Sequence, residues 1–264
     1  MQSNWKNAFV VSLFTFRAVV KGQFNGMAAE EWHQYNANRT LSLGYIVYPG
    51  FTPLDIFGPI DFLQRVSNDY NITLSTISKT AGPVSSKNPT AKSFGYPVLA
   101  THGVDDAPPI DLLFVPGGIG LRGETWMFDF ISKRFDEVDI VASVCSGASH
   151  LAMSGVLDNK RATNNKRNWA GATLNGTNVT WVPTARYVQD GKIWTSSGVA
   201  AGMDMTYALL KWMYGSDKID ARINEAEYSP HMDPNWDPYS KIFNVPGATF
   251  SGSTKDLVGP IGYD

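Results

Sequence analysis

The single cysteine of this chain, Cys145, lies where a reactive thiol can form. A β-rich run over 140–144 leads into it, and Gly147 opens a segment that favours helix, so a strand-to-helix junction is predicted there. N–H groups of a first helical turn stabilise a thiolate. A thiol of pKa about 8.5 is only about 3% ionised at pH 7, and a pKa about two units lower leaves about three quarters ionised. We therefore expect Cys145 to be an ionised nucleophile; the alternative is a buried apolar filler.

Two other segments are predicted to reach the same edge of the sheet, where ligands bind in open α/β folds. One is the glycine-rich turn after the apolar run 112–115, in which the N–H groups of Gly117, Gly118 and Ile119 are candidates for holding an oxyanion. The other surrounds Asp55, a lone carboxylate among apolar residues. Near a thiolate its pKa would be raised, leaving a proton to donate. The alternatives are an ordinary turn and a helix N-cap.

Apolar runs of strand length alternate with amphipathic segments of helix length from residue 41 onward. The predicted strands are 43–48, 72–77, 112–115 and 140–144, and the predicted helices are 56–66, 126–135, 200–214 and 216–228. The runs 180–188 and 193–195 are predicted to form a hairpin that turns at Asp190 and Gly191. This alternation predicts an α/β fold with one mostly parallel sheet covered by helices on both faces, in a single domain.

The chain divides into three predicted regions. Residues 1–40 lack periodicity and are expected to form an extension outside the core, 41–230 form the domain, and the proline-rich 231–264 form a surface meander. The apolar stretch 8–16 weakly resembles a secretory signal. Four Asn-x-Ser/Thr sequons exceed only slightly the roughly 2.5 that chance predicts; they begin at Asn38, Asn71, Asn175 and Asn178. A cytoplasmic location is favoured, and secretion remains the alternative.

The composition excludes several classes of protein. With 22 Lys and Arg against 24 Asp and Glu, the net charge of −2 offers no basic field for nucleic acid. One cysteine and four scattered histidines give neither an intrachain disulfide nor a local metal site. No apolar run reaches the roughly 18 residues that cross a bilayer, and no dinucleotide or phosphate-loop fingerprint is present. We expect no membrane segment, no metal and no cofactor.

The motifs resemble those of the DJ-1/PfpI superfamily, also described as ThiJ-like or class I glutamine amidotransferase-like proteins. Within it, the chain is similar to the isonitrile hydratase branch and to fungal ThiJ/PfpI proteins, because the acid at position 55 is aspartate rather than glutamate. The resemblance spans about 41–230 and implies a flavodoxin-like sandwich, a strained nucleophile elbow and a homodimer. The matching motifs are Asp55-Ile-Phe-Gly-Pro59, Val115-Pro-Gly-Gly-Ile-Gly120, Ser143-Val-Cys-Ser-Gly147, Gly155 to Thr163, and Thr195-Ser-Ser-Gly198 to Gly202-Met-Asp204.

The resemblance also assigns roles to particular residues. Cys145 matches the family nucleophile, Asp55 its partner acid, Ser146 the hydroxyl residue after the nucleophile, and 117–119 the anion-cradling loop. Ser146 stands where the peptidases of the superfamily have histidine, which disfavours a Cys–His protease dyad.

Two further departures bear on the activity. Asn164 and Asn165 stand where the hydratases have Thr-His, so the imidazole found near the cysteine in other members is missing. His150 does not replace this imidazole, because a helix makes a net rotation of about 140° over five residues, so the His150 side chain points away from the direction of Cys145. His150 is therefore predicted to be a core or interface histidine. The absence of a helix-turn-helix after residue 230 argues against the transcription-regulator relatives.

Three functions remain open. The leading hypothesis is a cofactor-free hydratase or lyase that acts on a small isonitrile-like or carbonyl substrate: Cys145 attacks the electrophilic carbon, Asp55 delivers and recovers the proton, and the loop amides hold developing charge. The second is a non-enzymatic redox or stress-response protein that senses oxidants through Cys145. The third is a secreted binding protein without chemistry.

Overall fold

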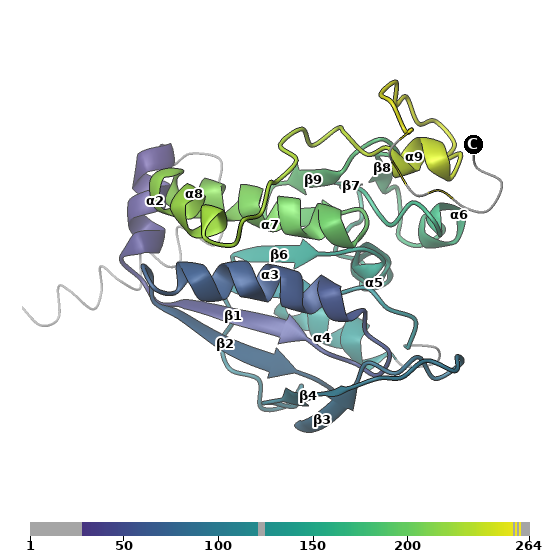
Figure 1. Ribbon diagram of the computed structural model, residues 1–264. Coiled ribbons are helices and arrows are strands. Elements are labelled where there is room, and N and C mark those ends of the chain that lie inside the picture. Colours follow the sequence, from purple (N-terminus) through teal and green to yellow (C-terminus); the bar gives the residue numbers. More distant parts are fainter. Residues whose placement is uncertain (1–27, 121–124, 256, 258, 260–264) are drawn as a thin grey trace, which may run out of the picture.

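A six-stranded sheet forms the centre of the computed structural model, which describes residues 28–120, 125–255, 257 and 259 (Figure 1). The strand order is β2-β1-β5-β6-β10-β9; the first five strands run parallel, and β9 is antiparallel to β10. This confirms the mostly parallel sheet and the predicted hairpin. The strands are β1 (Leu41–Ile46), β2 (Ile72–Ile77), β5 (Leu112–Val115), β6 (Ile140–Ser143), β9 (Tyr187–Asp190) and β10 (Ile193–Ser196).

Helices flank the sheet in two groups (Figure 1). The larger group comprises α2 (Ala29–Ala37), α3 (Pro53–Val66), α7 (Val199–Tyr214) and α8 (Asp217–Asn224), in which α7 contacts the other three. The other group pairs α4 (Trp126–Arg134) with α5 (Gly147–Met153). Helices on both faces bury β5 and β6 completely, which is why these strands do not alternate and are apolar apart from Ser143.

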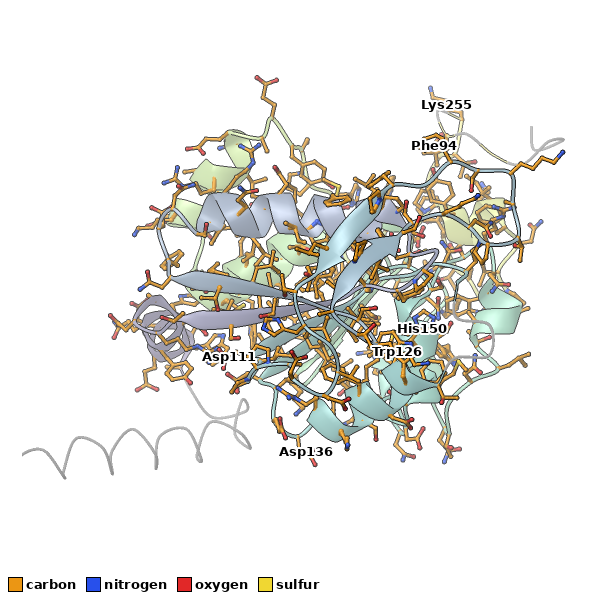
Figure 2. The ribbon with its side chains drawn as sticks, turned by 90° about the horizontal axis from the view of Figure 1, so that it is seen from below. Phe94, Asp111, Trp126, Asp136, His150 and Lys255 are labelled. Carbon is orange, nitrogen blue, oxygen red and sulfur yellow. The ribbon has the colours of Figure 1, made fainter. Side chains whose placement is uncertain are left out.

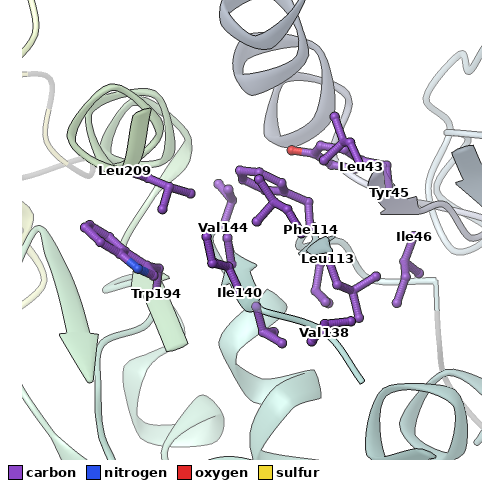
Figure 3. Packing of buried hydrophobic residues seen from close by; sticks show 14 of the residues in the cluster. Leu43, Tyr45, Ile46, Leu113, Phe114, Val138, Ile140, Val144, Trp194 and Leu209 are labelled. Atoms are coloured by element: carbon purple, nitrogen blue, oxygen red, sulfur yellow. The ribbon is translucent and has the colours of Figure 1, made fainter. Parts of the chain in front are cut away.

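The core lies between the sheet and these helices. Tyr45 of β1 stacks on Phe114 of β5 with ring centroids 4.9 Å apart. Trp194 of β10 and Leu209 of α7 fill the space beside Val144 (Figure 3). This core therefore packs against the strands from whose carboxyl ends the site residues emerge.

Within the described residues 28–40, helix α2 corrects the prediction that 1–40 is an extension outside the core. Trp32 is buried and lies 5.0 Å from Trp212 of α7, and the Asn36 side chain donates a hydrogen bond to the carbonyl oxygen of Met213. Because one tryptophan and one side-chain amide make these contacts, the sequence of α2 shows no apolar periodicity from which they could be predicted. The signal-like stretch 8–16 lies outside the described residues.

The remaining elements refine the predicted boundaries. The run 180–188 divides, because Thr180–Trp181 (β8) pairs in parallel with Arg161–Ala162 (β7). The last long helix ends at Asn224 rather than at residue 228. Four short elements were not predicted. They are β3 (Gly82–Ser85) and β4 (Pro97–Ala100), which form a hairpin, and the helices α6 (Trp169–Ala172) and α9 (Tyr239–Ile242).

The C-terminal segment is more than the expected surface meander. Five of its described residues are buried, and α9 forms within it. They are Asp237, Pro238, Ser240, Ile242 and Val245. Within the described ranges, no helix is long and apolar enough to cross a membrane.

Candidate active site

Cys145 occupies a tight elbow between β6 and α5. Its φ of 59° lies in the left-handed region that residues other than glycine rarely adopt. Gly147 makes the elbow possible, because a Cβ on it would lie 2.2 Å from the carbonyl oxygen of Val115. Cys145 nevertheless keeps part of its surface exposed. The strand-to-helix junction was predicted correctly, and it presents the thiol at the carboxyl edge of the sheet.

Replacing Gly147 with alanine is expected to lower the free energy of unfolding by at least about 3 kcal/mol, because the new methyl group meets backbone that cannot move aside. Chemical denaturation measures this. Gly191→Ala is the control: Gly191 has a positive φ of 59°, unlike Gly147, but open space around it, and its replacement should cost only about 1 kcal/mol. Equal small losses would contradict the steric explanation.

Asp55 is brought to the elbow from the first turn of α3, whose N-cap is Thr52. The side chain is fully buried, and its Oδ2 accepts a hydrogen bond of 2.9 Å from the N–H of Gly117. Oδ1 is buried and has no partner with hydrogen-bond geometry. Burial raises the pKa of Asp55 to about 7, opposed by the N–H of Gly117 and by interaction with the Cys145 thiol. Asp55 is therefore a proton acceptor or donor matched to neutral pH.

The pKa of the Cys145 thiol differs from the predicted one. Burial, assisted by the negative charge of Asp55, raises the pKa of Cys145 to about 12, although the backbone N–H of Ser146 and the amide of Asn165 act in the opposite direction. The expectation of an ionised thiolate is wrong, because desolvation and a neighbouring carboxylate outweigh the helix terminus. A neutral thiol beside a carboxylate of pKa about 7 remains, and the thiolate forms only as Asp55 takes the proton.

The N–H groups of the turn at 117–119 do not point to an empty oxyanion hole, as expected, but bond to acceptors of the protein itself. All three amides already donate hydrogen bonds within the protein: Gly117 to Asp55 Oδ2 at 2.9 Å, Gly118 to Ser146 Oγ at 3.1 Å, and Ile119 to the carbonyl oxygen of Gly50 at 3.2 Å. A Cβ on Gly117 would lie 2.8 Å from Asp55 Oδ2 and 2.7 Å from Ser146 Oγ. As arranged, the loop positions the acid and the elbow rather than offering free donors.

The hydroxyl of Ser146 is likewise engaged within the protein. It accepts the N–H of Gly118 and donates to the carbonyl oxygen of the same residue at 3.4 Å. This side chain bridges the elbow and the glycine-rich turn, and its interaction with the Cys145 thiol acts to lower the pKa of that thiol. Its expected role in substrate binding stays a prediction.

Asn165 is the site residue that sequence reasoning missed. Its Nδ2 donates to Cys145 Sγ at 3.1 Å, and its Oδ1 accepts the N–H of Arg167 at 3.1 Å, which fixes the orientation of the amide. The signal was available: Asn165 lies in the segment where the resemblance expects Thr-His. An amide provides a donor there without a titrating ring.

His150, labelled in Figure 2, is the core histidine that the helical angle predicts. It packs edge-on against Tyr48 at 5.5 Å and lies 6.0 Å from Phe128. Burial lowers its pKa to about 4, so the ring is neutral at physiological pH.

Comparison with known proteins places these features in a family. The model of the DJ-1/PfpI family matches residues 44–212, which is more than half of the chain. The chain belongs to the DJ-1/PfpI family. This DJ-1/PfpI protein is 31% identical over 193 residues to the isonitrile hydratase of Pseudomonas putida, an alignment that covers 72% of this chain and 79% of the relative.

Solved structures of other DJ-1/PfpI proteins share the fold. A ThiJ/PfpI family protein from Pseudomonas syringae superimposes with a TM-score of 0.61 at 24% identity, covering 80% of this chain and 84% of that one. DJ-1beta of Drosophila melanogaster gives 0.59 at 19% identity, covering 72% and 100%. In the described part of this DJ-1/PfpI chain, no group of three His, Cys, Asp or Glu side chains is placed to hold a metal ion.

Proposed function

We propose that this protein is a cofactor-free hydratase that adds water to the terminal carbon of a small isonitrile and releases a formamide. The observation that carries the proposal is the pairing of a partly exposed Cys145 with Asp55, whose pKa of about 7 suits proton transfer at neutral pH. The 31% identity to a protein named isonitrile hydratase supports the substrate class. We also expect a homodimer, as the resemblance implies.

The first step joins substrate and enzyme. Asp55 takes the thiol proton of Cys145 while the sulfur attacks the terminal carbon of the isonitrile, and the proton passes to that carbon. One S–C bond and one C–H bond form, which leaves a thioimidate on the enzyme. Asp55 is again ionised, and Asn165 Nδ2 stays beside the sulfur.

The second step consumes water. Asp55 accepts a proton from a water molecule that adds to the thioimidate carbon and passes that proton to the imidate nitrogen. The new hydroxyl then gives its proton to Asp55 as the C–S bond breaks and the formamide leaves, and Asp55 returns this proton to the sulfur. The hydrogen bond from Asn165 stabilises the leaving thiolate, because charge-assisted hydrogen bonds strengthen as charge develops on the acceptor.

A turnover assay with small alkyl and aryl isonitriles in ¹⁸O-water tests the proposal. We expect one ¹⁸O atom in each formamide and, on rapid quenching, an isonitrile adduct on Cys145 detectable by mass spectrometry. Absence of both formamide and adduct would overturn the proposal. Parallel arms with a 2-oxoaldehyde and with hydrogen peroxide represent the carbonyl and redox alternatives.

The raised pKa of the thiol weighs against the redox alternative, because oxidation follows thiolate character and exposure. We expect peroxide to oxidise Cys145 no faster than it oxidises free cysteine at pH 7, as followed by intact mass. Rapid oxidation together with no isonitrile turnover would favour the sensor.

A further inference from the structure

We propose that the C-terminal segment sets the reactivity of the active-site thiol: Lys166 and Asp237, neither of which touches the sulfur, are positioning residues that hold Asn165 against Cys145. The importance of this arrangement for catalysis rests on the proposed function, whereas its effect on the reactivity of the thiol does not. It gives a role to a buried ion pair that the chemistry described above does not use.

Lys166 lies in the interior with its ammonium group bonded to the turn that carries Asn165. Three acceptors surround Nζ: Thr163 Oγ1 at 2.7 Å, the carbonyl oxygen of Ala185 at 2.8 Å and that of Asn164 at 3.2 Å. An ammonium has three N–H donors, so each acceptor takes one. Two of the three acceptors belong to residues 163 and 164, directly before Asn165.

Asp237 supplies the counter-charge from the loop before α9. Its Oδ2 lies 3.3 Å from Lys166 Nζ, and both side chains are about 1% exposed. Its Oδ1 accepts the N–H of Tyr239 at 3.1 Å, which ties it to the C-terminal segment. Burial lowers the pKa of Lys166 to about 8, Asp237 opposes this, and Arg186 adds to it. Without Asp237, Lys166 loses its charge near neutral pH and has two donors for three acceptors.

From this turn, hydrogen bonds continue to the sulfur. The side-chain oxygen of Asn164 accepts the N–H of Asn165 at 2.7 Å, and its Nδ2 donates to Ser149 Oγ at 2.9 Å, on the helix that follows Cys145. Asn165 therefore stands on a turn fixed from both sides, with Nδ2 left for the sulfur at 3.1 Å. Loosening the turn removes a donor that lowers the pKa of the thiol.

The only cysteine of the chain makes the test direct, because every alkylation event reports on Cys145. Rate constants for alkylation by iodoacetamide are measured between pH 7 and 10 for wild type, Asp237→Asn, Asn165→Ala and the double variant. Tyr228→Phe is the matched control: its hydroxyl anchors the chain just before this segment to Asp204 at 2.6 Å, and this bond involves no residue of the 163–165 turn.

We expect Asp237→Asn and Asn165→Ala each to slow alkylation about tenfold across this pH range. The pKa of the thiol lies above the range, so each unit by which it rises lowers the thiolate fraction tenfold. The double variant should be no slower than the slower single variant, since both changes remove the same contact. Tyr228→Phe should alkylate at the wild-type rate, and Asp237→Glu, which keeps the charge, should recover most of the lost rate.

Three results would overturn the proposal: a wild-type rate for folded Asp237→Asn, a double variant in which the two effects multiply, or equal slowing by Tyr228→Phe. If Asp237→Asn does not fold, Ser149→Ala loosens the same turn from its other side. Slowing of severalfold supports the proposal, and a wild-type rate overturns it. Because alkylation requires no isonitrile, these outcomes are independent of whether the protein hydrates one.

Discussion

Replacing Cys145 with serine is expected to remove isonitrile turnover almost completely, by roughly 10⁴-fold or more in kcat. The serine hydroxyl is a far weaker acid than a thiol, and a base of pKa about 7 such as Asp55 cannot ionise it during attack. The rate of formamide production measures this loss.

Cys145→Ala serves as the control for that experiment, because it removes the nucleophile altogether. We expect the serine and alanine variants to be equally inactive and to retain the circular dichroism of wild type. A serine variant within tenfold of wild type would show that the sulfur forms no covalent intermediate.

Replacing Asp55 with asparagine is expected to lower kcat about 10³-fold, within the usual range for loss of a general base. The amide oxygen can still accept the N–H of Gly117, so the turn should keep its place. In wild type, the reactive form has Asp55 ionised. The value of kcat/KM should therefore rise with pH through about 7. The variant should lack this inflection, and a variant that kept it would assign the ionisation to another group.

The same pKa has a consequence for stability. Asp55 is fully buried, and its folded pKa of about 7 exceeds its ordinary value of 3.8, so the folded state binds the proton more tightly than the unfolded chain does. This contribution to stability is present below about pH 4 and is lost as the pH rises through 7. We expect the free energy of unfolding of wild type to decline by a few kcal/mol relative to Asp55→Asn across that interval.

The central sheet was predictable because most of its strands are short runs rich in apolar and β-branched residues, separated by turn residues. The runs 72–77 and 112–115 match β2 and β5 residue for residue. The hairpin of β3 and β4 was missed because its strands lack such runs and pair mainly with each other. Helix α2 was missed because it contacts α7 through one tryptophan ring and one amide hydrogen bond, of Trp32 and Asn36, and not through a periodic apolar face.

The site was predictable in its members but not in its electrostatics. Motifs pointed to Cys145 and Asp55, and the structure brings the two together. Whether the amide of Gly117 is free depends on a carboxylate 62 residues away, which no local pattern reveals. The thiol pKa was predicted too low because the dipole argument is local, whereas desolvation and the charge of Asp55 arise from the complete fold.

Because α2 docks on α7, the part of the chain that folds as one unit begins at α2 and not at residue 41. A shortened protein that began at residue 41, where the sheet begins, would uncover the surface that Trp32 and Asn36 cover, including Trp212. Newly exposed aromatic surface of this kind favours aggregation. The smallest autonomous version of this protein must therefore retain residues 29–37.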